Sequence, residues 1–420
     1  MDADVIVIGA GVAGLRCARA LEDAGLHVLT IDAGSTVGGR IRTSVIDGYT
    51  CDWGLQTINP QFPAIRHWVD LPALDMKYPM PALLVRRTDG LLLVGDPRRV
   101  PRVLPTLVRS RMISPSDLAS LARWAGSGMV GGRVLDADND TTLMASLDEY
   151  RVRGALREEL LLPLLHSMLA DSSGLTSATY AKWVLHALLN GTPGVPAAGM
   201  QALPEQLAAD LRSPVRLEVH VDSVVEAGSC VEVRTWGGTL SAMAAVVAVS
   251  PEAVDQLVAL PRPRMQGVTT WWFSAPEGPS ALPAFALDGR GGIGPVRTAV
   301  DVASFAPSYA PAQAHLVGAK TLLDRRDGRS RASAVKRHLS AIYGVPTEHW
   351  EVVAHYELPN AIPTHRPPLA DRQQVRLGNR VYVAGDHRKT GSIHGAMVSG
   401  QRAAEAVMAD LGRIPLRKAQ

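Results

Sequence analysis

Apolar residues at the start of the chain follow the pattern of two buried strands joined by a helix. Residues 5–8 form an unbroken run of Val and Ile, which is typical of a parallel strand buried on both faces. Residues 15–24 have the composition of a helix, and Gly25 ends it. A second apolar run, residues 27–31, leads into Asp32. The pattern predicts a strand, a helix and a second strand at the start of an α/β fold.

Glycines occupy the turn between the first strand and the helix. Gly9 permits a tight turn, Gly11 lets a pyrophosphate approach the backbone because it has no Cβ, and Gly14 lets the helix pack close to the strand. Val12 and Ala13 begin the helix, whose free N–H groups and partial positive charge attract an anion. The spacing therefore predicts a dinucleotide-binding turn.

The acid at the end of the second strand completes this site. Asp32 lies 23 residues after Gly9, where a carboxylate can accept hydrogen bonds from an adenosine ribose, and Ala33 follows it. No arginine comes directly after Asp32, which argues against a 2′-phosphate and therefore against NADP. The choice between NAD and FAD stays open at this point.

A second glycine turn, Gly38-Gly39-Arg40, follows the acid. It resembles the second pyrophosphate-contacting turn of FAD enzymes in the flavin amine oxidase superfamily, which includes monoamine and polyamine oxidases, protoporphyrinogen oxidases and carotenoid desaturases. Glycine turns expose N–H groups, and Arg40 adds a charge-assisted contact to phosphate. The alternative for Arg40 and Arg42 is a solvated loop pair.

The end of the chain carries a second motif of this superfamily. A buried strand ends in Gly385-Asp386, and a helix then begins near Ser392, Ile393, Gly395 and Ala396. The resemblance implies that Asp386 bonds a ribityl hydroxyl or a phosphate. It also implies that the start of the helix lies under the flavin ring, where its N–H groups stabilise the reduced state. A dehydrogenase that binds NAD has no need of this segment, so the motif favours FAD.

Three internal stretches extend the resemblance. Gly54-Leu55-Gln56 matches the stretch where a glycine lies against the flavin ring, with an ordinary loop as the alternative. Residues 200–211 match the family's return into the FAD domain. Beyond them, the resemblance implies that the backbone of Val224 contacts the adenine end and that Ser250 follows a strand that ends at the nucleotide.

These features together predict a fold and its division into domains. The fold class is α/β, with a Rossmann-like FAD-binding domain and a discontinuous α+β substrate domain. Residues 1–72, 200–260 and 375–420 are expected to form the FAD domain. The substrate domain is expected to combine a helical insert, residues 73–199, with a sheet, residues 261–374.

The substrate side shows departures from amine oxidases. Trp271 and Phe273 share one face of a predicted strand and are candidates for the pocket wall, with plain sheet core as the alternative. The family's lysine is absent from residues 267–272, and its cage tyrosine corresponds to Ser392. His387 and His394 flank the flavin end as weak candidates for a catalytic base, His394 also for the pocket, although surface histidines are the simpler interpretation.

Cysteines and overall composition narrow the remaining choices. No cysteine follows Cys230, so FAD is expected to be non-covalent. The three cysteines form no disulfide framework and no metal site. A net charge of +3 on 420 residues gives no reason to expect nucleic acid binding. A first strand near residue 4 leaves no room for a signal peptide, and the longest apolar run, residues 242–249, is too short to span a membrane. A cytoplasmic protein is therefore expected.

One basic segment is a candidate surface for binding a membrane or an anionic molecule. Residues 86–111 contain seven arginines and two acids. This pattern predicts either a weak membrane-surface or anionic-substrate patch, or a solvated helix face with an apolar underside.

The sequence thus predicts an FAD-dependent oxidoreductase that abstracts hydride from an apolar or amine-bearing small molecule to flavin N5. Oxygen or another electron acceptor would reoxidise the flavin, and a homodimer is an open possibility. Two alternatives remain: a C–C desaturase or isomerase of a polyene or lipid-like substrate, and a flavin-binding protein without turnover.

Overall fold

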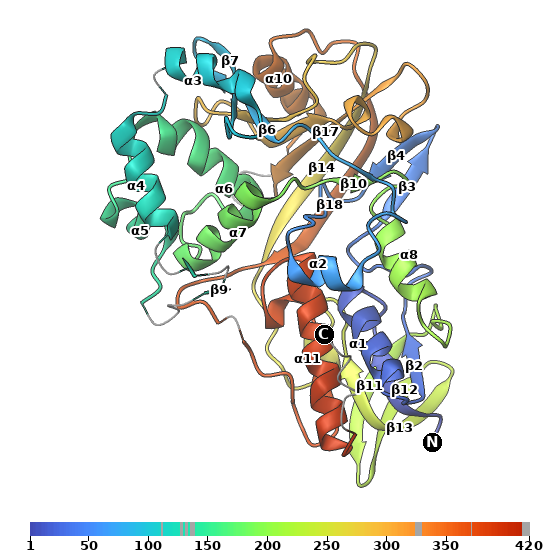
Figure 1. Cartoon of the computed structure of the whole chain (residues 1–420). Coiled ribbons are helices and arrows are strands. Elements are labelled where there is room, and N and C mark those ends of the chain that lie inside the picture. Colours follow the sequence, from blue (N-terminus) through green and yellow to red (C-terminus); the bar gives the residue numbers. More distant parts are fainter. Residues whose placement is uncertain are drawn as a thin grey trace.

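Two sheets organise the molecule. The computed structural model describes residues 1–110, 112–126, 129–130, 133–134, 139–323, 330–370 and 372–413, so Arg111 of the basic segment lies outside the described residues. In Figure 1 one sheet, with the first and last helices, occupies the lower half, and the second sheet stands above it. The α/β fold class expected from the sequence is confirmed.

Three distant parts of the chain build the first sheet. Its order is β11-β12-β13-β1-β2, and β19 also pairs with β13. β13, β1, β2 and β19 are parallel, as the unbroken apolar runs predicted. The strands are β1 (Ala3–Ile8), β2 (Val28–Ile31), β11 (Val221–Ala227), β12 (Cys230–Thr235), β13 (Gly238–Val247) and β19 (Val381–Val383).

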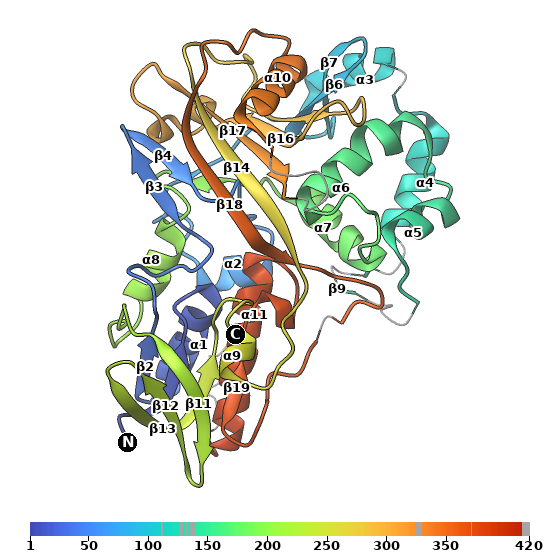
Figure 2. The same ribbon diagram turned by 180° about the vertical axis from the view of Figure 1, so that it is seen from behind.

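The first and last long helices cover this sheet together. α1 (Val12–Asp23) and α11 (Ile393–Asp410) lie side by side in Figures 1 and 2, in blue and red. A Cβ at Gly400 would lie 2.1 Å from the carbonyl oxygen of Ala13, so the helices cross closely because position 400 has no side chain. The two ends of the chain are therefore locked together.

The second sheet has seven strands in the order β18-β14-β17-β16-β15-β6-β7. Most pairs are antiparallel, and β15 and β6 are parallel. α10 (Ala332–Tyr343) covers one face. The strands are β6 (Ala82–Arg87), β7 (Gly90–Gly95), β14 (Met265–Ala275), β15 (Phe285–Asp288), β16 (Val296–Asp301), β17 (His315–Leu322) and β18 (Glu351–Pro363).

The expected helical insert is only partly helical. β6 and β7 form a hairpin at the edge of the second sheet, because an apolar run, residues 82–85, meets a turn at Asp89 and Gly90. The remainder packs as helices around its own apolar cluster. The helices are α3 (Leu104–Ser110), α4 (Pro115–Gly126), α5 (Leu143–Glu149), a π-helical turn (Leu156–Leu161), α6 (Leu162–Leu169) and α7 (Ala178–Asn190).

The remaining elements are short. They are β3 (Thr43–Ile46), β4 (Tyr49–Asp52), α2 (Pro63–Trp68), β5 (Met76–Lys77), β8 (Met129–Val130), β9 (Arg133–Val134), β10 (Val195–Pro196), α8 (Ala202–Ala209) and α9 (Val254–Leu257), with 3₁₀ turns at Pro101–Val103, Val302–Ser304, Pro307–Tyr309 and Asp386–Arg388. We propose that the two sheets are the cores of two domains with the boundaries that the sequence predicted.

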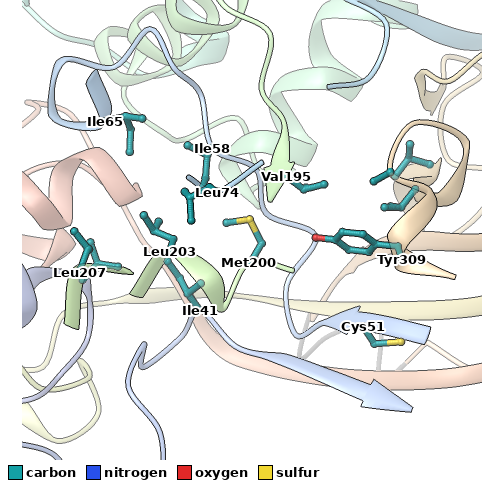
Figure 3. Close-up of a cluster of buried hydrophobic side chains, with 14 of the residues drawn as sticks. Ile41, Cys51, Ile58, Ile65, Leu74, Val195, Met200, Leu203, Leu207 and Tyr309 are labelled. Atoms are coloured by element: carbon teal, nitrogen blue, oxygen red, sulfur yellow. The ribbon is translucent and has the colours of Figure 1, made fainter. Parts of the chain in front are cut away.

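A buried carboxylate ties the two sheets together. Figure 3 shows Tyr309 beside Met200 in the apolar cluster between them. Asp52 accepts hydrogen bonds from the Tyr309 hydroxyl at 2.9 Å, the Met200 N–H at 2.9 Å and the Thr43 hydroxyl at 2.6 Å. Burial raises the pKa of Asp52 to about 6, although these three donors oppose the rise.

No helix in the described part of the chain combines the length and the apolar character needed to cross a membrane. Within the same residues, His, Cys, Asp and Glu form no group of three or more that could hold a metal ion.

Candidate functional site

The first glycine turn has one crowded side and one open side. A Cβ at Gly14 would lie 1.9 Å from the Gly9 carbonyl oxygen, and one at Gly9 would lie 2.5 Å from that of Ala248. A Cβ at Gly11 would have no atom within 4 Å. Gly9 and Gly14 therefore let the turn fold, whereas Gly11 leaves a free surface for a ligand.

The second glycine turn lies directly beside the first. Gly38 and Gly11 form a parallel bridge, and the Gly38 N–H donates to the Ala10 carbonyl at 2.9 Å. Both Gly38 and Gly39 have positive φ, at 116° and 60°, which explains the glycine pair. Two segments that the sequence identified separately thus form one cradle.

Asp32 holds this cradle in shape. One carboxylate oxygen accepts the Ala10 N–H at 2.6 Å, and the other accepts the Gly34 N–H at 2.7 Å. The side chain is only half-buried and lines the cavity described below. Each oxygen has a second lone pair, so the carboxylate can still accept bonds from a hydroxyl of a ligand.

Arg40 and Asp386 join the two ends of the chain at this site. The Arg40 Nη2 atom donates to Asp386 Oδ1 at 2.5 Å, and Nη1 donates to the Ala361 carbonyl at 2.8 Å. Burial lowers the pKa of Arg40, but the charge and hydrogen bond of Asp386 outweigh it, so the net shift is upward. Arg40 is therefore a fixed cation at the second glycine turn.

The closing helix begins at an ordered loop. The Ser392 hydroxyl caps α11 by accepting the Gly395 N–H at 2.9 Å. Gly391 is held on both sides: its N–H donates to His365 Nε2 at 2.8 Å, and its carbonyl accepts the Tyr180 hydroxyl at 3.0 Å. A Cβ at Gly395 would lie 1.9 Å from the Thr390 carbonyl oxygen, so this glycine is a packing requirement.

One continuous cavity of about 760 Å³ joins these parts. The predicted cofactor residues that line it are Gly9, Gly11, Val12, Ala13, Asp32, Ala33, Gly38, Gly39, Arg40, Gly54, Leu55, Gln56, Ser250, Gly385, Asp386, Ser392, Ile393 and Ala396. Gly14 and Gly395 lie just beneath its wall for the packing reasons given above. Fold geometry thus gathers residues from both ends and the middle of the chain.

Val224 is the predicted cofactor residue that the structure moves away from the cavity. It lies inside β11, paired with Val233 of β12, so its backbone groups belong to the sheet. Residues 219–221, which precede the regular part of β11, line the cavity in its place. A bulge between Val221 and Ser223 marks the point where the strand leaves the site.

Aromatic residues form part of the cavity wall. Phe62 stacks on Trp183 with ring centres 4.9 Å apart, and Trp183 stacks on Tyr180 at 6.0 Å. All three line the cavity, together with Met168, Val184 and Leu188. The sequence interpretation missed this wall, although Tyr180 and Trp183 are three residues apart on one helix and so share a face.

The expected pocket residues Trp271 and Phe273 do not line the cavity. They are buried on the opposite face of the second sheet, in the cluster under α10. Trp272 faces the first sheet instead, and its indole N–H donates to the Asp52 carbonyl at 2.7 Å. Period-2 alternation correctly separated the aromatic residues into two sets on opposite faces. The apolar face of α10 determines which set is buried away from the cavity.

His387 is buried and His394 is half-buried, so neither is an exposed surface histidine. His394 stacks on Phe62 at 5.2 Å, accepts the Ala64 N–H at 3.3 Å, and supports the aromatic wall from behind. His387 lines the cavity beside Asp386, and neither ring nitrogen has a hydrogen-bond partner among the described residues. Burial lowers the pKa of each to about 4, so both are neutral at pH 7.

Lys320 is the charged residue that the sequence interpretation missed. It lines the cavity from β17, in register with Thr270 of β14. Gly318, two positions earlier on the same face, packs against Trp272 and Leu55. A single lysine within an apolar strand, residues 316–322, was the available signal.

The sequence pattern described as flavin containing amine oxidoreductase matches residues 12–408. The chain belongs to this family. Membership confirms FAD as the cofactor and FAD-dependent oxidoreductase as the class of enzyme, as the glycine turns and the closing motif predicted.

Relatives of this flavin oxidoreductase have different named activities. It is 28% identical over 270 residues to AofH of Mycobacterium tuberculosis, provisionally named a flavin-containing monoamine oxidase, with 59% of this chain and 57% of AofH covered. The aligned part thus spans little more than half the length of that relative. Cyclohexylamine oxidase of Brevibacterium oxydans has a TM-score of 0.70 at 20% identity, covering 98% of this chain and all of that one. A fatty acid isomerase of P. acnes has a TM-score of 0.72 at 16% identity, covering 96% and 98%.

The residues of this flavin oxidoreductase fit FAD. The open face at Gly11, the cationic Arg40, the half-free carboxylate of Asp32 and the unpaired ring of His387 supply complementary groups along the cavity. None of the three cysteines lines the cavity, which agrees with non-covalent binding. When bound, FAD supplies the ability to accept a hydride.

Proposed function

We propose that this protein oxidises a small, largely apolar substrate at a carbon bonded to nitrogen, with hydride passing to flavin N5. The observation that carries the proposal is one continuous cavity of about 760 Å³, whose wall contains both the glycine turns with Arg40 and the aromatic residues Phe62, Tyr180 and Trp183. An apolar wall next to a cofactor site is suited to hold a substrate and to exclude water.

The protein groups have positioning roles in this reaction. The aromatic wall contacts the apolar body of the substrate and limits its orientations. The hydride leaves carbon with both electrons, and the lone pair on the neighbouring nitrogen stabilises the cation that remains. No side-chain base is therefore required, in agreement with neutral, sterically enclosed histidines near the cavity. Oxygen or another acceptor would complete the cycle by removing the two electrons.

Anaerobic mixing tests this proposal. The purified holoprotein would be mixed with a panel of aromatic and aliphatic amines, and flavin absorbance near its visible bands would be followed. Bleaching by at least one amine class supports oxidation next to nitrogen. Bleaching by no amine, with a flavin that dithionite still reduces, contradicts it.

Desaturation or isomerisation of a polyene or lipid-like substrate is the second candidate. The apolar character of Met168, Val184 and Leu188 in the cavity wall favours it. Polyunsaturated fatty acids in the same anaerobic assay separate the candidates, since bleaching or double-bond migration with lipids alone would replace the amine proposal. A homodimer stays a prediction, which light scattering can test.

A further inference from the structure

Lys320 forms a polar spot on the cavity face of the second sheet. Its backbone pairs with Thr270 on one side and with Thr298 on the other, so the three side chains share one face. The Thr270 hydroxyl is buried and has no hydrogen-bond partner among the described residues. The Lys320 and Thr270 side chains thus start from neighbouring positions on one face of the sheet, where unsatisfied polar groups are costly.

Among the residues that the structure describes, no carboxylate neutralises this ammonium. In the described part of the chain, Lys320 makes no ion pair or hydrogen bond through its side chain. Glu357 also lines the cavity, but it pairs with Thr269 on β14, one position out of the Lys320 row, so its side chain starts from the other face. Burial lowers the pKa of Lys320 to about 8, and the amine is still mostly protonated at pH 7.

The Lys320 ammonium also comes from a different part of the chain than the other cations of the cavity wall. Among the described residues that line the cavity, the other cations, Arg40 and Arg42, come from the glycine-turn segment. Arg40 is paired with Asp386. Of the described residues in the cavity wall, Lys320 is the one lysine or arginine that comes from the seven-stranded sheet or from the helices of the aromatic wall.

We propose that this cavity recognises a substrate with an apolar or aromatic body and an anionic group, such as a carboxylate, that pairs with Lys320 and Thr270. The aromatic wall contacts the body, and the ammonium contacts the anion. Dicationic amines are disfavoured because they would bring a second positive charge to an enclosed, unpaired one. The inference deepens the proposed function by naming the substrate class, and it rests on that function only for the bond that is oxidised.

Binding of two matched probes tests the inference without turnover. Benzoate and benzylamine have the same aromatic body and opposite charge. Each would be titrated into the holoprotein at pH 7, and the change in the flavin absorption spectrum would give Kd. The variants are Lys320→Met, Lys320→Arg and, as a control, Lys77→Met at a half-buried lysine that lies outside the cavity wall and pairs with Asp75.

Wild type is expected to bind benzoate more tightly than benzylamine. Lys320→Met should weaken benzoate binding by about tenfold to a hundredfold, the usual contribution of a charge-assisted hydrogen bond. Lys320→Arg should restore most of the affinity, and Lys77→Met should leave it unchanged. Benzylamine should bind no worse to Lys320→Met than to wild type.

A pH titration of wild type keeps the test informative if Lys320→Met fails to fold. Benzoate affinity should fall as pH rises through about 8, where the Lys320 ammonium loses its proton. Unchanged benzoate affinity in a folded Lys320→Met variant, or no loss across this pH range, overturns the inference. So does a loss of FAD affinity in Lys320→Met with benzoate binding intact, since Lys320 would then contact the cofactor. Benzoate selectivity in a protein whose flavin no amine reduces would leave this inference standing and remove the proposed function.

Discussion

Arg40 and Asp386, which are 346 positions apart in the sequence, form a charge-assisted hydrogen bond of 2.5 Å inside the cofactor cavity. Arg40 belongs to the second glycine turn, and Asp386 follows the last strand of the first sheet. Asp386 is buried, whereas the Arg40 side chain keeps part of its surface open. The pair therefore closes the fold and leaves part of a cation open to the cavity.

Breaking this pair should weaken FAD binding. Arg40→Met removes the cation and leaves Asp386 as a buried, unpaired carboxylate, so we expect FAD affinity to fall by about tenfold to a hundredfold. The free energy of unfolding of the apoprotein should fall by roughly 1–3 kcal/mol, between the values for exposed and buried pairs. Fluorescence titration of the apoprotein with FAD measures the first effect, and urea unfolding measures the second.

Arg66→Met is the matched control for this variant. Arg66 is an exposed residue of α2 outside the cavity wall. An Arg40→Met protein that binds FAD as tightly as Arg66→Met would show that Arg40 acts only within the fold.

Substitutions at two glycines of the first turn should separate an effect on apoprotein stability from an effect on FAD binding. Gly14→Ala puts a Cβ 1.9 Å from the Gly9 carbonyl oxygen, so we expect a loss of about 1–3 kcal/mol of apoprotein stability. Gly11→Ala meets no atom within 4 Å and should leave apoprotein stability nearly unchanged while it weakens FAD binding. Thermal unfolding with and without FAD checks both. Equal FAD-induced stabilisation of Gly11→Ala and wild type would contradict the open-face interpretation of Gly11.

The sequence predicted the cofactor half of the site better than the substrate half. Glycine turns, Asp32 and Gly385-Asp386 carry backbone and ligand requirements that restrict the residue type locally, so a single sequence reveals them. Trp271 and Phe273 were misplaced because a strand between two apolar layers has no polar face to mark its orientation.

The aromatic wall and Lys320 show a different limit. Tyr180 and Trp183 come from α7 and Phe62 directly precedes α2, and these segments meet only in the tertiary structure. In a sequence, aromatic residues that will line a cavity look the same as aromatic residues of the core. The importance of Lys320 depends on the loop at Leu55, which covers Gly318 on the same face. Both features depend on contacts between segments that are distant in the sequence, and local sequence patterns do not reveal such contacts.

The basic segment is expected to contact membranes only weakly. Several of its arginines are engaged within the protein: Arg86 with the Ile342 carbonyl, Arg87 with Glu159, Arg98 with Asp96 and Arg99 with the Gly191 carbonyl. α3 has no buried residue, and Leu104 and Val108, one turn apart, are 53% and 71% exposed.

Anionic vesicles test this expectation. Two exposed arginines, Arg102 and Arg109, flank Leu104 and Val108, and each contributes about 1 kcal/mol near an anionic surface. We expect partial co-sedimentation with phosphatidylserine vesicles at low salt. At 0.5 M salt the sedimented fraction should fall roughly tenfold, because salt screens the arginines from the anionic surface. Val108→Asp should abolish it, whereas Val45→Asp, at an exposed valine of β3, should not. No pelleting of wild type at low salt would leave the solvated helix face as the interpretation.

Buried neutral histidines should make the apoprotein sensitive to mild acid. Burial lowers the pKa of His387 to about 4, below the value near 6.5 of an unfolded chain, so the unfolded state gains a proton first as pH falls. The contribution of His387 to stability is complete above pH 6.5 and declines towards pH 4, by roughly 1–2 kcal/mol at pH 5. Asp52 acts in the opposite direction, because its pKa is raised to about 6 and its folded form takes up a proton more readily.

Comparison of His387→Leu with wild type isolates the histidine, since the contribution of Asp52 is common to both. His387 has no hydrogen-bond partner among the described residues, so leucine removes the titrating group at little cost in contacts. We expect the difference in the free energy of unfolding between pH 7 and pH 5 to shrink by roughly 1–2 kcal/mol in His387→Leu. Urea unfolding of both apoproteins at the two pH values measures it. An identical pH dependence would mean that His387 titrates normally and therefore reaches water. The same variant should also bind FAD more weakly, because the unpaired ring nitrogens of His387 lie in the cavity wall beside Asp386.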